Sequence, residues 1–189
     1  MPALTLVRHG LPEIDPTVPA DRWQLSPGAL PALTQLRLSG LIASGSRWFS
    51  SPEPKARESA EALTQSPVAV VEALREAERP AGWYQNATEF SALVRRSVLE
   101  PHTPAADGWE PAAATQARVL AASQAILAKT ASDPVVLVGH GTAWTLLVAA
   151  LTASSPDLDA WESMRMPDLA VLEVSASGRS RLRRPWGQG

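Results

Sequence analysis

The residues best suited to chemistry in this sequence stand where short apolar segments end. Arg8-His9-Gly10, Ser50-Ser51-Pro52 and Gly139-His140-Gly141 each close such a segment, and a helical pattern follows each of them. Two of the three histidines of the chain lie at these positions. In an open α/β sheet, ligands bind at the carboxyl ends of the strands, where helix N-termini present unbonded N–H groups.

Arg8, His9 and His140 together predict a site for an anion. The guanidinium group of Arg8 is a planar fork of donors that suits a phosphate or a carboxylate. The glycines that flank the two histidines are expected to let the backbone approach the bound group closely.

The elements that must position these residues alternate between strands and helices. Apolar runs predict strands at residues 4–7, 47–50, 68–71, 135–138, 169–174 and 179–184, the last two as a hairpin around Ser177-Gly178. Helices are predicted at residues 27–41, 55–65, 86–99 and 111–129, and after Gly141. Asn86 is a good N-cap for the third helix, and Thr142 is a candidate cap for the last. The alternation predicts an α/β fold, a three-layer αβα sandwich around a mostly parallel sheet with an antiparallel edge strand. The strand order does not follow from the pattern.

Composition excludes several classes of protein. The chain has 189 residues, of which 45% are hydrophobic, enough for one globular domain over residues 1–189. Its net charge of −2 gives no field that would recruit nucleic acid or an anionic membrane. Because the sequence contains no cysteine, disulfides and thiolate chemistry are excluded. The N-terminus lacks a basic segment and a cleavage site, so we expect a cytoplasmic protein.

Four segments in the same order resemble the histidine phosphatase superfamily, also called the phosphoglycerate-mutase-like family. Leu6-Val7-Arg8-His9-Gly10 is similar to its opening motif, and residues 50–60 are similar to its second phosphate-binding segment. Leu74-Arg75-Glu76 is similar to the segment that supplies an acidic residue, and Val138-Gly139-His140-Gly141 to the second-histidine motif. The likeness extends over residues 4–150.

The resemblance implies hydrolysis of a small phosphorylated substrate through a covalent phosphohistidine on His9. It also implies that Arg8, His140 and a cation of the second segment hold the phosphoryl oxygens. Glu76 would act as the general acid and base, and we favour it over Glu13, Glu72 and Glu78, which are nearby in sequence. No metal and no other cofactor are implied.

The sequence departs from the family pattern at two positions. An alignment without gaps places the second arginine of the family on Lys55, and we favour Lys55 over Arg57, which lies two residues farther along the helix. Lysine keeps the charge but loses the two-pronged geometry. Asp15 stands where the family often has an asparagine near the phosphate, so we expect either that its carboxylate faces away or that the loop differs.

Other classes of function are weighed against this one. An α/β-hydrolase would need a nucleophile at Gly141, which has no side chain. A zinc site on the two histidines is disfavoured by the neighbouring Arg8 and by the histidine spacing. A mutase-type phosphotransferase and a non-catalytic phosphate-binding module, its clamp weakened by Lys55, stay open, although the chain is shorter than the mutases. His102 is expected at the surface. The identity of the substrate and the oligomeric state do not follow from the sequence.

Overall fold

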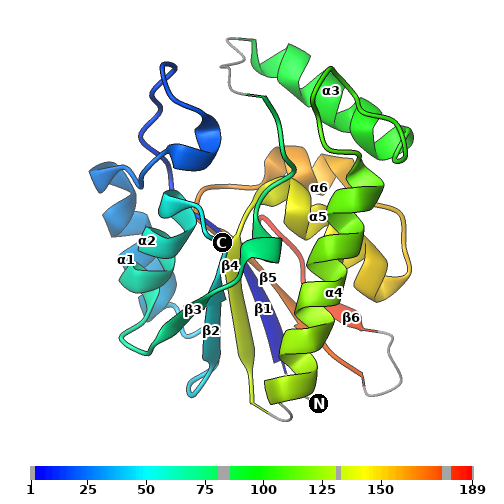
Figure 1. The fold of residues 1–189 in the computed structure, drawn as a ribbon. Helices are drawn as coiled ribbons and strands as arrows, with labels where there is room; N and C mark the ends of the chain where they lie inside the picture. The colour runs from blue at the N-terminus through cyan, green and yellow to red at the C-terminus, as the bar shows by residue number, and fades with distance from the viewer. Residues whose placement is uncertain (1–2, 81–85, 131–132, 176–179, 189) are drawn as a thin grey trace.

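The computed structural model describes residues 3–80, 86–130, 133–175 and 180–188. One six-stranded sheet forms its centre, in the order β3-β2-β4-β1-β5-β6 (Figure 1). Its strands are β1 (Ala3–Arg8), β2 (Arg47–Ser50), β3 (Val68–Val70), β4 (Val135–Gly139), β5 (Asp168–Glu173) and β6 (Arg181–Arg184). The first four are parallel, whereas β5 is antiparallel to β1 and β6 is antiparallel to β5. The prediction of a mostly parallel sheet with an antiparallel edge is confirmed.

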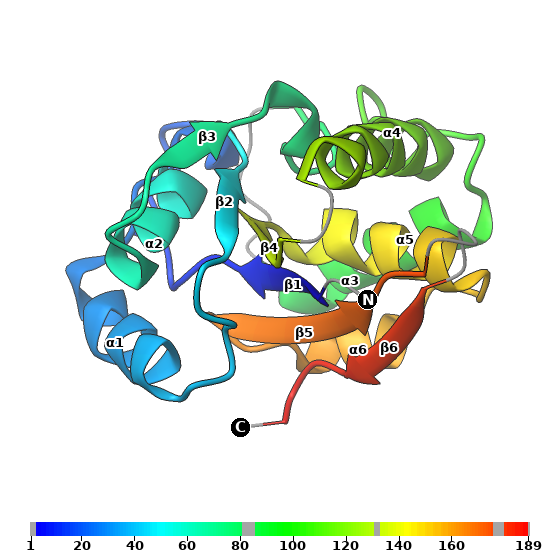
Figure 2. The same ribbon diagram turned by 90° about the horizontal axis from the view of Figure 1, so that it is seen from below.

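Helices cover both faces of this sheet, as Figure 2 shows. They are α1 (Leu30–Leu38), α2 (Pro54–Leu63), α3 (Ala87–Leu99), α4 (Ala112–Thr130), α5 (Gly141–Thr152) and α6 (Leu158–Ser163). Helices α1 and α2 contribute to the apolar cluster on one face, and α4 and α5 to the cluster on the other. The three-layer αβα architecture is therefore confirmed. Over the part of the chain described here, no helix is both long and apolar enough to cross a membrane.

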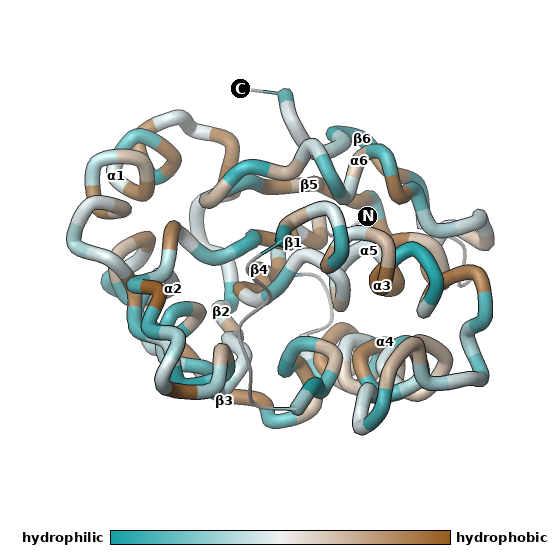
Figure 3. The backbone as a smooth tube through the Cα atoms, turned by 90° about the horizontal axis from the view of Figure 1, so that it is seen from above, coloured by the Kyte–Doolittle hydropathy of each residue, from teal (hydrophilic) through white to brown (hydrophobic). Residues whose placement is uncertain are grey.

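The two central strands are apolar on both faces because both faces are covered. In β1, Leu4 and Leu6 pack in the cluster formed with α4 and α5, while Val7 packs in the cluster formed with α1 and α2. Strand β4 is buried over its whole length, and its side chains alternate between the same two clusters. A continuous apolar run is the expected sequence of a parallel strand in such a position. Figure 3 shows the backbone from above, coloured by hydropathy, with the strands of the sheet between the helices.

Several element boundaries differ from the predicted ones. Residues 27–29 form a 3-10 turn, and α1 starts at Leu30, which places Pro31 in the first turn, where a missing N–H leaves no bond unmade. The short helix α6 was not predicted. Asn86 is confirmed as an N-cap, since its side chain accepts hydrogen bonds from the N–H groups of Thr88 and Glu89. The turn at Ser177-Gly178 lies outside the described residues.

The strand order places β1 beside β4 at the point where the chain changes direction across the sheet. After β1 the chain continues to α1 on one face, whereas after β4 it continues to α5 on the opposite face. The carboxyl ends of two such strands open a crevice between them, which is the usual ligand site of an open α/β sheet. His9 and His140 are the residues that follow these two strands.

Candidate active site

Register brings the two predicted histidines together. Arg8 is paired with Gly139 in the parallel ladder, and the backbone N–H of His9 donates to the carbonyl oxygen of Gly139 at 2.9 Å. The two imidazole rings consequently lie with centroids 5.2 Å apart and planes inclined at 63°. Both side chains are buried. Two histidines far apart in sequence thus form a single polar site at the carboxyl edge of the sheet.

The ring of His9 is held in one tautomer. Its Nδ1 lies 2.7 Å from the carbonyl oxygen of Gly10, and because a carbonyl only accepts, Nδ1 must carry the proton. Burial, with added repulsion from His140 and Lys55, holds the pKa of His9 well below its ordinary value. The imidazole is therefore neutral at neutral pH, and its Nε2 carries a free lone pair.

His140 is held by residues that follow β2, the strand beside β4 in the sheet. Its Nε2 lies 2.7 Å from the hydroxyl oxygen of Ser51 and 3.2 Å from Oε1 of Glu53. Burial, together with the positive charge of Lys55, lowers the pKa of His140 to about 3. The second imidazole is thus also neutral at neutral pH.

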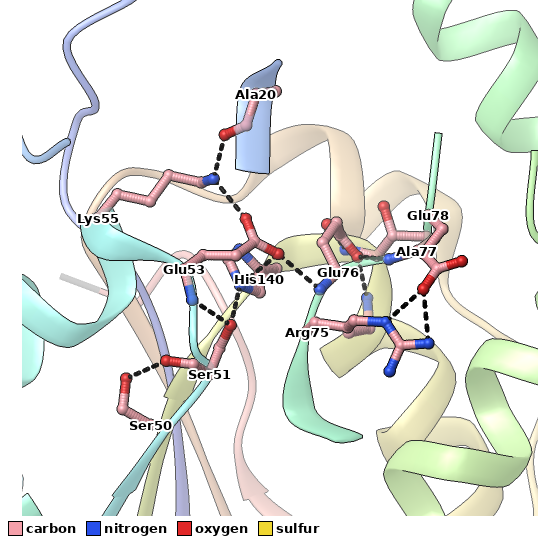
Figure 4. A network of polar contacts seen from close by, with 12 residues as sticks. Ala20, Ser50, Ser51, Glu53, Lys55, Arg75, Glu76, Ala77, Glu78 and His140 are labelled. Carbon is pink, nitrogen blue, oxygen red and sulfur yellow. Dashed lines mark hydrogen bonds and ion pairs between the residues drawn. The ribbon is translucent and has the colours of Figure 1, made fainter. Parts of the chain in front are cut away.

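Lys55 faces the site, whereas Arg57 does not. Lys55 is buried in the first turn of α2, and its Nζ donates to the carbonyl oxygen of Ala20 at 2.6 Å and to Oε2 of Glu53 at 2.5 Å (Figure 4). Arg57 is exposed. The charge of Lys55 depresses the pKa of both histidines, which places it within electrostatic reach of each. Of the two cations weighed in the sequence, Lys55 is the one the fold brings to the histidines.

Glu76 reaches the site from the segment after β3 and binds the start of α5. Its carboxylate accepts hydrogen bonds from the backbone N–H groups of Thr142 at 3.1 Å and Ala143 at 2.9 Å. The helix begins at Gly141 with His140 in the N-cap position, and no side chain of its own caps it. The prediction that Thr142 caps this helix is therefore wrong: Thr142 supplies an N–H group, and Glu76 supplies the acceptor.

The charge of Glu76 is set by opposing effects. Burial raises its pKa, but the positive charge of Arg79, the neighbouring His140 and the N–H of Ala77 outweigh burial, so the net shift is downward. Nη2 of Arg79 lies 3.6 Å from Oε2 of Glu76. The guanidinium group also stacks on two aromatic rings, 4.8 Å from the centroid of Phe90 and 5.3 Å from that of Trp109. Glu76 is ionised at neutral pH when the site holds no ligand.

Arg8 enters the site with part of its donor capacity unused. Its Nη1 donates to the carbonyl oxygen of Met164 at 2.8 Å. Its Nε is buried and has no hydrogen-bond partner among the residues that the structure describes. Burial lowers the pKa of Arg8, an effect that Glu76 and Asp168 oppose. A buried N–H without an acceptor is costly, so this group is suited to the oxygen of a bound anion.

The glycines beside the histidines leave space for neighbouring side chains. A Cβ at Gly10 would lie 2.9 Å from Cδ1 of Leu25, and a Cβ at Gly139 would lie 2.5 Å from the ring of Trp144. Both therefore make room for core side chains. At Gly141 a Cβ would lie 3.5 Å from Nε of Arg8, so this glycine does border the site.

Other candidate residues are exposed to solvent. Glu13, Glu72 and Glu78 are exposed, and His102 is exposed as predicted. Asp15 is exposed as well, and its carboxylate accepts hydrogen bonds from the N–H and hydroxyl groups of Thr17. These two bonds lower its pKa. No group of three or more His, Asp or Glu side chains suited to a metal ion occurs among the described residues.

Sequence reasoning did not single out three residues that shape the site: Glu53, Arg79 and Arg118. Glu53 joins Lys55 to His140, and Arg79 lowers the pKa of Glu76. Arg118 on α4 donates to the carbonyl oxygens of Ala73, Arg75 and Glu76, which fixes the backbone that carries the Glu76 side chain. The sequence did offer one signal for Glu53, a carboxylate two residues before Lys55. The contacts of Arg79 and Arg118 depend on the tertiary fold, and no local pattern indicates them.

Comparison with known proteins agrees with this geometry. The sequence profile of the histidine phosphatase superfamily (branch 1) matches residues 30–185, and the chain belongs to this family. The profile match begins after Arg8-His9-Gly10, so the first histidine motif is placed by the fold. No curated protein matches the chain significantly.

Solved structures share the fold over nearly the whole chain. Mycobacterial glucosyl-3-phosphoglycerate phosphatase has a TM-score of 0.75 at 22% identity, and the match covers 97% of each chain. YhfR of Bacillus stearothermophilus has a TM-score of 0.77 at 21% identity, with 97% of this chain and 96% of that chain covered. Phosphoserine phosphatase of Entamoeba histolytica has a TM-score of 0.72 at 15% identity, with 100% and 98% covered.

Proposed function

We propose that this chain hydrolyses small phosphomonoesters without a metal ion, through a phosphohistidine formed at Nε2 of His9. The observation that carries the proposal is the hydrogen bond from Nδ1 of His9 to the carbonyl oxygen of Gly10, which leaves Nε2 unprotonated. A neutral imidazole with a fixed tautomer is a competent nucleophile toward phosphorus. Membership of the family and the phosphatase neighbours support the same reaction class.

In the first step, Nε2 of His9 bonds to phosphorus as the bond to the alcohol oxygen breaks. Arg8, Lys55 and His140 are proposed to hold the phosphoryl oxygens, because these groups border His9 and donate hydrogen bonds or positive charge. The unused N–H of Arg8 Nε supports this role for Arg8. No metal is invoked in this step, because protein donors are proposed to hold the phosphoryl oxygens in its place.

Glu76 is proposed to give a proton to the leaving oxygen and, in the second step, to take one from the attacking water. Its carboxylate is ionised in the free site, so it must first gain a proton. A phosphoryl group bound nearby supplies negative charge, which raises the pKa of a neighbouring carboxyl. The second step releases phosphate and restores His9 and the protonated carboxyl.

The substrate is proposed to be a small phosphorylated molecule. Two of the structural neighbours are named as phosphatases of glucosyl-3-phosphoglycerate and of phosphoserine, and these two compounds are the first to test.

We further propose that residues 1–189 form one domain, because the sheet takes strands from both ends of the chain. A cytoplasmic location stays a prediction.

The test is phosphate release from a panel of phosphomonoesters in the presence of a chelator. Release by the native chain that is lost in His9→Ala, with release kept in His102→Ala as a matched exposed control, would support the proposal. A phosphoryl label that stays on the protein after alkaline quenching, and is absent from His9→Ala, would support the covalent step. Release that survives His9→Ala would refute the mechanism. Phosphate binding by the native chain without turnover of any ester would favour the non-catalytic alternative.

A further inference from the structure

The candidate phosphate site contains a buried carboxylate of its own. The side chain of Glu53 is only 7% exposed, and it lies between α2 and the carboxyl end of β4 (Figure 4). Its Oε2 accepts from Nζ of Lys55 at 2.5 Å. Its Oε1 lies 3.2 Å from Nε2 of His140 and accepts from the backbone N–H of Glu76 at 2.9 Å. Glu53 therefore contacts three residues to which the proposed mechanism assigns a role.

This arrangement leaves the site with little unbalanced positive charge. Both imidazoles are neutral, so the fixed cations are Arg8, Lys55 and Arg79. Arg79 lies beside the Glu76 carboxylate, and Lys55 is paired with Glu53. Lys55 also donates to Ala20, so two of its three N–H bonds already have acceptors. A phosphoryl group that enters must share Lys55 and His140 with an anion already bound to them.

We propose that Glu53 is an internal anion that competes with the phosphoryl group for Lys55 and His140, and so sets the affinity of the site for phosphate. This inference rests on the proposed function, because it places the phosphoryl group beside these residues. Two like charges that share the same donors repel one another strongly where the side chains are buried. The phosphoryl group alone is then bound weakly, the product phosphate leaves readily, and substrates are distinguished by the contacts of their remaining atoms.

The affinity for inorganic phosphate, measured by calorimetry, tests the proposal without any need for turnover. Glu53→Gln removes the charge and keeps the shape, and we expect it to bind phosphate about tenfold more tightly or better. Glu53→Asp keeps the charge and should bind as weakly as the native chain. Glu61→Gln, an exposed position on the same helix, is the matched control for net charge and should not differ from the native chain. Unchanged or weaker binding by Glu53→Gln, or equal tightening by Glu53→Asp, would overturn the proposal.

A second measurement uses the native protein and stays valid if Glu53→Gln does not fold. Lys55 and Lys129 are the two lysines of the sequence, and Lys129 is exposed on α4. In protein labelled with 15N-lysine, added phosphate should shift the Nζ resonance of Lys55 and leave that of Lys129 in place. An unshifted Lys55 at saturating phosphate would contradict the proposal.

The two proposals fail in different ways. Ester hydrolysis that depends on His9, combined with no gain in phosphate affinity in Glu53→Gln, would refute the role of Glu53 alone. Tighter phosphate binding by Glu53→Gln, without hydrolysis of any ester by the native chain, would refute the proposed reaction alone.

Discussion

The carboxylate of Glu76 accepts a 2.9 Å hydrogen bond from the backbone N–H of Ala143, in the first turn of the helix that follows His140. A negative charge at this position is stabilised by the unpaired N–H groups and by the helix dipole. The same carboxylate lies beside Arg79 and within electrostatic reach of His140. The residue proposed to transfer protons therefore also fixes the start of the helix that follows the second histidine.

Replacement of Glu76 should separate these two roles. In Glu76→Gln the amide oxygen can accept from only one of the two α5 N–H groups, so we expect the unfolding free energy to fall by about 1–3 kcal/mol. Without a proton to transfer, kcat should fall about 10²- to 10⁴-fold. Urea unfolding and phosphate release measure the two effects. Glu78→Gln, an exposed neighbour paired with Arg75, should change neither, and a kcat near the native value in Glu76→Gln would remove Glu76 from the mechanism.

Removal of the Arg79 charge should move the pH profile of the reaction. Arg79 lowers the pKa of Glu76, so this pKa should rise in Arg79→Met. If kcat/KM requires protonated Glu76, its alkaline limb should then shift to higher pH, because the carboxyl stays protonated further up the scale. Methionine can still pack against Phe90 and Trp109. Arg75→Met serves as the control, and a limb that stays in place or moves to lower pH would show that Arg79 does not tune Glu76.

The two buried histidines should make the protein less stable as the pH falls from 7 to 5. The pKa of His140 is lowered to about 3 and that of His9 is also lowered, so the unfolded chain takes up protons below about pH 6.5 while the native chain does not. Each histidine should cost about 2 kcal/mol of unfolding free energy at pH 5 relative to pH 7. Glu110, whose pKa is lowered to about 2 by its bonds to Arg118 and Glu78 against the effect of burial, adds its own loss only below about pH 4.5.

Urea unfolding at pH 7, 6 and 5 measures this dependence. His140→Gln should remove about half of the slope, because one of the two buried imidazoles is gone. The slope of His102→Gln should equal that of the native chain, since His102 is exposed. A native slope close to zero over this range would mean that the two imidazoles take up protons in the folded state.

Gly139→Ala should destabilise the fold through Trp144. The added Cβ would lie 2.5 Å from Cζ2 of the Trp144 ring. That ring is fully buried, and its Nε1 donates to the carbonyl oxygen of Val7 at 2.8 Å, so it has little freedom to move. Overpacking of this kind costs about 1–3 kcal/mol. In Gly28→Ala the nearest contact of the new Cβ is 3.5 Å, to Oγ of Ser26, and this control should lose less; equal stability of the two variants would show that the Trp144 pocket is not rigid.

Local signals in the sequence were sufficient for much of the fold. The apolar run before Arg8 and the one before His140 predicted the two central strands. Residues two positions apart on a helix point to different faces, and this distinguished Lys55 from Arg57. The features that local patterns could not predict are contacts between residues that lie far apart in the sequence. Thr142 has a side chain suited to an N-cap, but an acceptor from far along the chain, Glu76, takes that place. The pairing of Glu53 with His140 likewise requires β2 and β4 to be neighbours, which no spacing in the sequence reveals.

The position of β1 has a consequence for synthesis of the protein. Both of its neighbours in the sheet, β4 and β5, come from the last third of the chain. At about 5–20 residues per second, the ribosome needs on the order of ten seconds to reach them after β1 is made. During that time Leu4, Leu6 and Val7, which are fully buried in the finished fold, belong to a strand with two unpaired edges. The nascent chain therefore carries an apolar segment whose sheet partners do not exist until β4 and β5 have been made.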